Sequence, residues 1–332
     1  MAGVSFAFST IDNRPGAGLR TCRSNRYADS MRIIDMEQIG DVINELEWLG
    51  PVEKSLDAVA ETTLNQKNSF MQQVRNFLHG TWLGHPLHPV ITDVPLGAWT
   101  TAAVCDLYEF ASGDKKFSRG ADMAVGIGLI GAAGAAVAGL NDWQFTNDKP
   151  KRVGAMHAVF NLSATAFYLA SWLERRRGNR ASGIANGLAG FALSLGGAWL
   201  GGHLVYQEKI GVNHAPQHLP EKFVAIMPLE ELPPGKLCRA RAGDVDLVLF
   251  RRGERIYALA EKCAHLGGPL AEGKIAGLSV RCPWHGSRFS LENGRVLDGP
   301  AAYDQPCLAV RVRNGLIEVR NARVSRNASR AE

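Results

Sequence analysis

The sequence lacks several features that would place it in familiar functional classes. Its 37 Lys and Arg outnumber 32 Asp and Glu for a net charge of +5, but the basic residues form no stripe, so we expect no nucleic-acid partner. The six cysteines show no regular spacing of a disulfide framework, which favours a reducing compartment. Residues 1–32 contain no apolar core of signal-peptide length. We expect residues 1–50 to be disordered or to lie upstream of the true start.

The middle third of the chain is apolar and rich in glycine. Four apolar segments lie at about 89–110, 123–140, 153–173 and 183–206, each near the ~20 residues that cross a bilayer. The second and fourth segments carry glycines at spacings that allow close helix approach in lipid, and they have almost none of the polar stripes of a soluble bundle. We therefore predict a four-helix transmembrane domain over 81–208, in a multi-pass protein of the cell membrane with the lipid bilayer as a partner.

An amphipathic pattern precedes these segments, over residues 51–80. Apolar residues recur at roughly helical spacing, and Lys, Glu, Asn and Gln fill the other face. This pattern predicts a helix that lies on the membrane surface or packs against its own protein.

Two short motifs near the C-terminal end bring together residues that bind metals. Cys263-Ala264-His265 and Cys282-Pro283-Trp284-His285 are separated by a spacer of 16 residues. Two thiolates and two imidazoles are the ligands of a Rieske 2Fe-2S centre, with Cys₂ on one iron and His₂ on the other. A structural Cys₂His₂ zinc site is the alternative. The glycines and prolines of both loops resemble the Rieske pattern, and this resemblance favours the cluster.

These loops resemble those of Rieske iron–sulfur proteins, through Cys-x-His-Leu-Gly-Gly and Cys-Pro-x-His-Gly-Ser. The resemblance implies that Cys263, His265, Cys282 and His285 hold the cluster. The quinol-oxidising branch has a further cysteine in each loop, where this chain has Gly268 and Trp284, so the resemblance points to the ferredoxin-like or oxygenase-like branches. It also implies that Ser287 raises the reduction potential and that Pro300 belongs to a loop covering the cluster. With Phe289 in place of an accompanying tyrosine, we expect an intermediate potential.

Short β-type runs alternate with turns around these motifs. They predict an antiparallel all-β Rieske domain over 221–322, with a linker at 209–220 and a disordered tail at 323–332. The helical block at about 75–206 resembles an uncharacterised family of four-helix membrane domains, through the motifs at 79–89 (HGTWLGHPLHP) and 93–99 (DVPLGAW). The predicted fold class is therefore α + β and multidomain, with a four-helix transmembrane bundle before the Rieske domain.

Alternation of helix direction places six ionisable residues near one end of the predicted bundle, the end from which the Rieske domain emerges. They are His85, His88, Asp93, Asp142, His157 and His203. Ionisable residues at membrane depth are costly and usually functional, so the group is a candidate site for haem b or a quinone, and less so for a metal ion. The alternative is that the histidines are interfacial and hydrated, and that Asp142 caps a helix end.

Together these patterns predict a membrane-anchored electron-transfer protein or oxidoreductase component. It would carry a Rieske 2Fe-2S cluster and pass single electrons between a soluble redox partner and a quinone or haem in the membrane. The alternative is a membrane-localised ferredoxin-like module that serves a separate oxygenase or reductase, with the helices as an anchor. Positive charge in the loops at the far end of the bundle mildly favours that end as the cytoplasmic one. Loading of the cluster favours the opposite orientation, with the Rieske domain in the cytoplasm, and we expect the latter.

Overall fold

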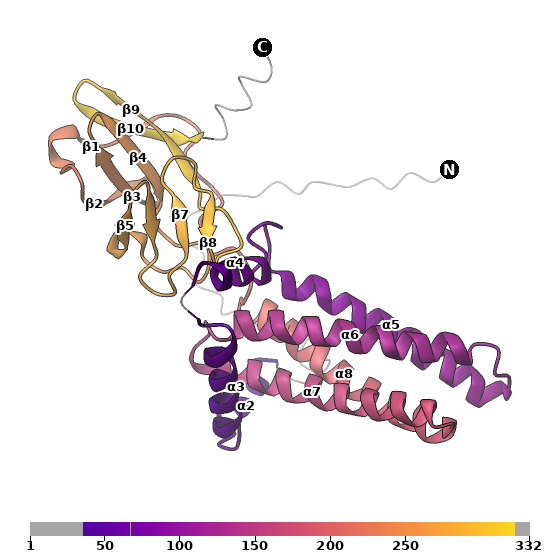
Figure 1. Ribbon diagram of the computed structural model, residues 1–332. Helices are drawn as coiled ribbons and strands as arrows, with labels where there is room; N and C mark the ends of the chain where they lie inside the picture. Colours follow the sequence, from indigo (N-terminus) through magenta and orange to yellow (C-terminus); the bar gives the residue numbers. More distant parts are fainter. Residues whose placement is uncertain (1–35, 67, 323–332) are drawn as a thin grey trace, which may run out of the picture.

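The computed structural model describes residues 36–66 and 68–322 (Figure 1). A helical part precedes a domain of antiparallel strands that sits at one end of the long helices, so the predicted α + β architecture is confirmed. The expected disorder over residues 1–35 and 323–332 concerns residues outside those described.

Four long helices form the bundle: α5 (Leu87–Ser112), α6 (Ser118–Trp143), α7 (Asp148–Arg176) and α8 (Arg180–Tyr206). Each contains one predicted apolar segment and extends it by up to five residues at either end. α5 packs chiefly on α6 and α7 on α8, which makes two antiparallel hairpins that lie against each other. Small residues allow this close packing. The buried face of α6 consists largely of glycine and alanine, and that of α8 largely of glycine with one serine.

Three of these helices, α6, α7 and α8, are long and apolar enough to cross a membrane. The fourth, α5, does not meet that standard, which differs from the prediction of four equivalent spans. Its apolar run is interrupted by His88, Asp93, Asp106 and Glu109, and prolines and threonines lower its hydropathy further.

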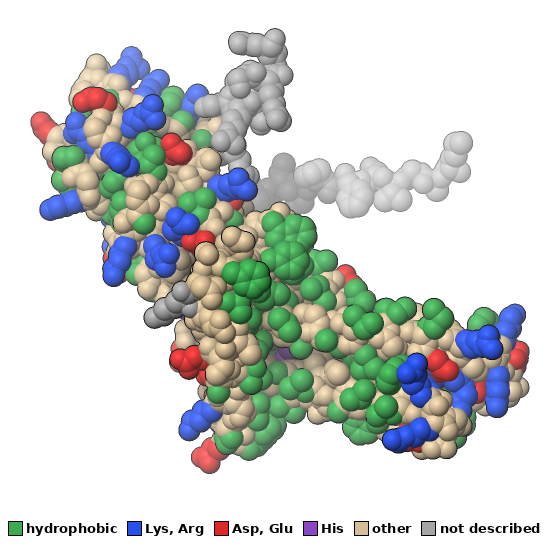
Figure 2. Space-filling model, in the orientation of Figure 1, with side chains coloured by type: hydrophobic (Ala, Val, Ile, Leu, Met, Phe, Trp, Pro, Cys, Tyr) green, Lys and Arg blue, Asp and Glu red, His purple; other side chains and the backbone are tan. Residues whose placement is uncertain are grey.

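Hydrophobic side chains cover the outside of the bundle between the β domain and a charged far end (Figure 2). Several large ones are strongly exposed, including Phe110, Ile130 and Tyr206. An apolar belt of this kind on long helices is the surface expected for contact with lipid tails.

Three shorter helices lie at the end of the bundle nearest the β domain: α2 (Met36–Asn44), α3 (Leu49–Thr63) and α4 (Ser69–Leu78). Residues 36–44 are therefore helical, contrary to the disorder expected there, because Ile43 and Leu49 bury their side chains in a core shared with α7 and α8. The amphipathic segment 51–80 is divided between α3 and α4, and Asn68 caps α4 by accepting a 2.7 Å hydrogen bond from Met71 N–H. Both helices pack on their own protein.

The β domain consists of two antiparallel sheets. The larger has the order β1-β10-β9-β4-β3-β2 and the smaller β5-β6-β7-β8. The strands are β1 (Val224–Pro228), β2 (Leu237–Ala242), β3 (Val245–Arg252), β4 (Arg255–Ala260), β5 (Lys274–Ala276), β6 (Ser279–Arg281), β7 (Arg288–Ser290), β8 (Val296–Asp298), β9 (Cys307–Arg313) and β10 (Leu316–Asn321). Asn314 and Gly315 both have positive φ, which suits the two-residue turn between β9 and β10.

Hydrogen bonds join the β domain to the helical part at several points. The Asn76 side chain on α4 donates to Leu297 O (3.3 Å) and accepts from Gly299 N–H (3.0 Å). In the connection after α8, Gly211 O accepts from the Tyr303 hydroxyl (2.9 Å) and His214 N–H donates to Ala264 O (3.0 Å). These contacts hold the loops of the β domain against the end of the bundle.

Candidate functional site

The four predicted cluster ligands come from two loops with matching backbone structure. The first loop joins β4 to β5 and the second joins β6 to β7. In each, a glycine N–H bonds back to the cysteine carbonyl, from Gly267 to Cys263 (2.9 Å) and from Gly286 to Cys282 (3.2 Å). Both glycines have φ of +80°, a conformation that other residues rarely adopt. The paired turns bring two cysteines and two histidines to one tip of the domain.

The chemistry of these side chains fits a 2Fe-2S cluster. His265 and His285 lie with their ring centroids 5.1 Å apart, and the buried Nδ1 of His265 has no hydrogen-bond partner among the described residues. Burial lowers the pKa of both histidines, so both are neutral and able to bind metal. The Cys263 thiol donates a hydrogen bond that lowers the pKa of Cys282 to about 7.

The two candidate metal centres would use these four side chains differently. A Rieske cluster divides its ligands between two irons, whereas a structural zinc ion draws all four around itself. Two cysteines and two histidines are the ligand types that the cluster requires.

The predicted tuning residues surround this tip. Ser287 is fully buried, and its Oγ accepts a 2.9 Å hydrogen bond from Ala301 N–H, which leaves its own O–H available to a bridging sulfide. At Gly268, a Cβ atom would lie 2.9 Å from Cys282 Sγ and 3.0 Å from the Trp284 ring, so a larger residue would crowd the loops. Pro300 is buried in the loop that follows β8. Their effect on the potential stays a prediction.

The histidine edge of the site faces the bundle. Phe145, in the turn between α6 and α7, has its ring centroid 6.3 Å from that of His265 and 6.1 Å from that of His285. On its other side the Phe145 ring lies 5.4 Å from His79, at the end of α4. One aromatic ring therefore separates the two cluster histidines from a third histidine that belongs to the helical part.

His79 is a candidate functional residue that the sequence reasoning missed. It is 2% exposed, and its Nδ1 lies 2.7 Å from Asp142 Oδ1 and 2.9 Å from the Asn141 amide. Because a carboxylate only accepts hydrogen bonds, Nδ1–H of His79 donates to Asp142. The available signal was its place at the start of the HGTWLGHPLHP motif.

The structure divides the six predicted His and Asp residues. His88 and His157 meet inside the bundle with ring centroids 6.1 Å apart, whereas Asp142 pairs with His79. The buried His203 lies 3.3 Å from Glu208, on another side of the bundle end. Two members lie at the surface: His85, beside the Pro86 carbonyl, and Asp93 on α5.

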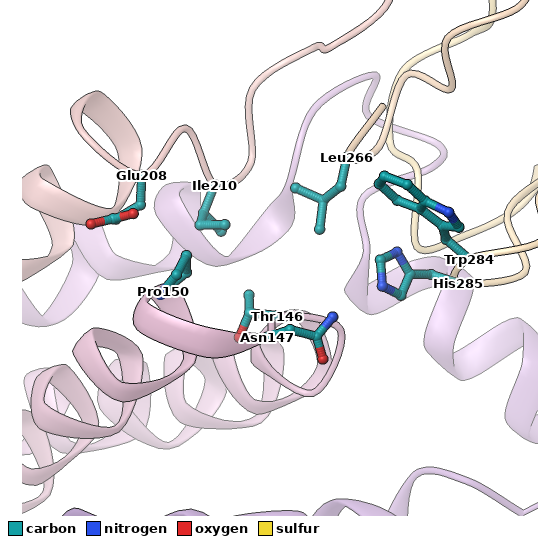
Figure 3. Close-up of a pocket in the computed structure, with 8 residues that line it drawn as sticks. All are labelled: Thr146, Asn147, Pro150, Glu208, Ile210, Leu266, Trp284 and His285. Carbon is teal, nitrogen blue, oxygen red and sulfur yellow. The ribbon is translucent and has the colours of Figure 1, made fainter. Parts of the chain in front are cut away.

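A pocket of about 520 Å³ opens between the cluster loops and the end of the bundle (Figure 3). His285, Trp284 and Leu266 line it from the β domain. The bundle side contributes residues from the α6–α7 turn, the start of α7 and the segment after α8, namely Thr146, Asn147, Pro150, Glu208 and Ile210. Four of the lining side chains are apolar and four are polar or ionisable.

Comparison with known families gives the same two-part division. Residues 84–214 match the family described as predicted membrane protein (DUF2231), and residues 222–309 match the Rieske [2Fe-2S] domain. Apoptosis-inducing factor 3 of Homo sapiens is 31% identical over 100 residues, which are 30% of this chain and 16% of that protein. The chain therefore spans less than a fifth of that relative's length.

Smaller relatives are matched over most of their length. The 3-phenylpropionate/cinnamic acid dioxygenase ferredoxin subunit of Escherichia coli is 30% identical over 89 residues, 26% of this chain and 83% of the subunit. The solved ferredoxin of carbazole 1,9a-dioxygenase from Nocardioides aromaticivorans IC177 is 25% identical with a TM-score of 0.29, over 30% of this chain and 97% of that one. Through its β domain the chain belongs to the Rieske [2Fe-2S] family, which supports an electron-transfer role.

Proposed function

We propose that the protein is a membrane-anchored Rieske protein that passes single electrons between a soluble partner and a redox site, a quinone or a haem, in or against its helical bundle. The observation that carries the proposal is the direction of the ligand histidines. Both rings pack on Phe145 of the bundle, so the edge through which an electron would leave faces the helices. When bound by these loops, a 2Fe-2S cluster supplies one-electron transfer.

The anchoring half of the proposal rests on the bundle. Three helices have the length and composition to cross a bilayer, and exposed apolar side chains surround them. α5 would complete the multi-pass domain, because it packs along α6 and buries its acidic residues Asp106 and Glu109 inside the protein. We place the β domain on the cytoplasmic side, where the cluster is loaded.

The quinone form of the proposal rests on the pocket beside His285. A flat ring can enter between Leu266, Ile210 and Trp284, with apolar side chains along its faces. Imidazole, carboxylate and amide groups at the edges of the pocket can bond to ring oxygens or exchange protons with them. Thr146 and Asn147 of the α6–α7 turn line the pocket opposite His285, and the Phe145 ring next to them contacts the His285 ring at 6.1 Å between centroids.

The second candidate function is a membrane-localised ferredoxin-like module that serves a separate oxygenase or reductase. One observation favours it: Trp284, next to the ligand His285, is 57% exposed and can contact a docked protein. The ferredoxin subunits among the relatives carry the names of dioxygenase systems. Under this alternative, the helices serve only to anchor the ferredoxin-like β domain at the membrane.

The test uses full-length, cluster-loaded protein in liposomes, mixed with a quinol under anaerobic conditions while visible absorbance follows cluster reduction. Ile210→Trp fills the pocket and should slow reduction tenfold or more, a loss of about 1.4 kcal/mol, whereas dithionite should reduce this variant as fast as wild type. Phe110→Trp is the matched control, because Phe110 is 83% exposed at the far end of α5. If quinol reduces neither wild type nor variant while a soluble ferredoxin reductase does, the module function stands instead.

A further inference from the structure

The bundle contains an internal repeat. His88 contacts His157, Trp99 stacks on Tyr168 with ring centroids 4.0 Å apart, and Asp106 pairs with Arg175. In each pair the first residue lies on α5 and its partner lies 69 positions later on α7. The two helices run in the same direction, so equal offsets place three successive contacts along one line through the bundle.

The other two helices repeat the pattern at a second constant offset. Glycines 128, 134 and 139 of α6 recur 62 positions later as glycines 190, 196 and 201 of α8. Gly128 packs on Trp99 and Gly190 on Tyr168, so equivalent glycines face the equivalent aromatic rings. The α5–α6 and α7–α8 hairpins are therefore two copies of one unit, and parallel repeats of this kind are related by an axis along the membrane normal.

The histidine pair has the same surroundings on both sides of that axis. His88 Nδ1 lies 2.8 Å from Ala135 O on α6, and His157 Nδ1 lies 2.8 Å from Gly197 O on α8, again 62 positions apart. One turn further along each helix, a glycine lies against the imidazole: a Cβ would be 2.9 Å from His88 Cε1 at Gly139 and 3.3 Å from His157 Cε1 at Gly201.

These hydrogen bonds determine which ring nitrogens remain available to bind a metal. A backbone carbonyl only accepts, so each Nδ1 carries a hydrogen, and in the neutral imidazole each Nε2 then carries a lone pair. The Asn161 amide nitrogen lies 3.3 Å from both ring nitrogens of His157, but its shortest bond is the 2.8 Å one to the His157 carbonyl. An Nδ1–H held by a carbonyl is the usual second bond of a histidine that binds a metal through Nε2.

From this geometry we infer that His88 and His157 are the two protein ligands of one transition-metal centre on the repeat axis, either the iron of a haem or a bare ion such as copper. In a linear nitrogen–metal–nitrogen arrangement, two metal–nitrogen bonds of about 2.0 Å separate the imidazole ring centroids by roughly 6 Å, and the observed separation is 6.1 Å. Bound there, the metal would supply a second one-electron centre. His85, Asp93, Asp142 and His203 take no part in it.

The position suits exchange with the Rieske domain. His79, which packs on Phe145 next to the cluster histidines, bonds to Asp142 on α6. Ala135, whose carbonyl accepts the hydrogen bond from His88, lies seven residues before Asp142 on the same helix, about 10 Å along its axis. The inferred role as redox partner of the cluster rests on the function proposed above, but metal binding does not.

The test is the cofactor content of full-length protein, purified in detergent from cells supplied with iron and a haem precursor. A Soret band with one haem per chain identifies a haem, whereas one extra metal per chain without a Soret band identifies a bare ion. His88→Ala and His157→Ala should each remove the extra centre, and His85→Ala should retain it. Unchanged cluster EPR signals would show that the variants are folded.

Exogenous imidazole should restore the centre to His88→Gly and His157→Gly, which separates ligand loss from misfolding. Wild-type protein without a Soret band and without metal beyond the cluster irons overturns the inference, as does retention of the centre in either alanine variant. Failure of the proposed function would give a different result. The metal centre would then be present, but quinol would still leave the cluster oxidised.

Discussion

Replacing Gly128 by alanine should destabilise the bundle at the centre of its internal repeat. A Cβ at this position would overlap Trp99 Nε1 and lie 2.8 Å from Trp99 Cε2, far inside contact distance. The indole cannot move away easily, because it is 3% exposed and stacks on Tyr168. Overpacking of a filled core costs about 1–3 kcal/mol, and we expect Gly128→Ala to lose stability in this range.

Substitutions at two further glycines separate the effect of packing from that of helix propensity. Gly97 is in the interior of α5 with open space around its would-be Cβ, so Gly97→Ala should stabilise the bundle by about 0.4–1 kcal/mol through the helix preference of alanine. Gly190 is the repeat partner of Gly128, and its Cβ would meet the Tyr168 ring at 2.9 Å. Gly190→Ala should therefore be destabilising, but less so than Gly128→Ala.

The assay is reversible unfolding of the three variants and wild type in the same detergent, followed by helical circular dichroism. The expected order of stability is Gly97→Ala, wild type, Gly190→Ala and Gly128→Ala. If Gly128→Ala and Gly97→Ala shift stability in the same direction by the same amount, alanine propensity alone decides the result. The packing of Trp99 between the two hairpins would then be refuted.

Three other predictions concern charge, potential and orientation. Asp106→Asn should lower the free energy of unfolding by about 3–5 kcal/mol, because the buried Arg175 guanidinium, 2% exposed, loses its charged partner. The double variant Asp106→Leu/Arg175→Met should recover much of this loss, and stability losses that simply add would contradict the pairing. Ser287→Ala should lower the midpoint potential of the cluster in an EPR redox titration, and an equal midpoint would remove the tuning role. A fluorescent protein fused after residue 332 should be bright in cells, whereas an active alkaline phosphatase at the same position would place the β domain outside the cytoplasm.

Local sequence information was enough to predict the long helices and to show that each pair of proposed cluster ligands shares one loop. Cys263 and His265, like Cys282 and His285, share a short loop, so their spacing alone brings each pair together. Helix length and apolar composition follow from single segments in the same way. The tendency to span a membrane was harder to judge for α5, because two of its acidic residues, Asp106 and Glu109, are buried and paired with arginines of other helices.

Contacts between distant segments could not be predicted in this way. The bond from His79 to Asp142 joins residues 63 positions apart and depends on how α4 crosses the end of the bundle. Reasoning from helix direction placed six ionisable residues at one end but could not say which of them face each other. The structure selects His88 and His157. The constant offset of the α6 and α8 glycines is present in the sequence, and would have revealed the repeat.

The proposed function requires that the cluster exchange electrons with the bundle on which its ligand histidines pack. The most direct measurement is a freeze-quench EPR time course of cluster reduction after oxidised protein in liposomes is mixed with excess quinol. We expect a Rieske signal that grows at a rate independent of protein concentration, because the transfer occurs within one molecule. A rate that rises in proportion to protein concentration, or no reduction until a soluble protein donor is added, would contradict it.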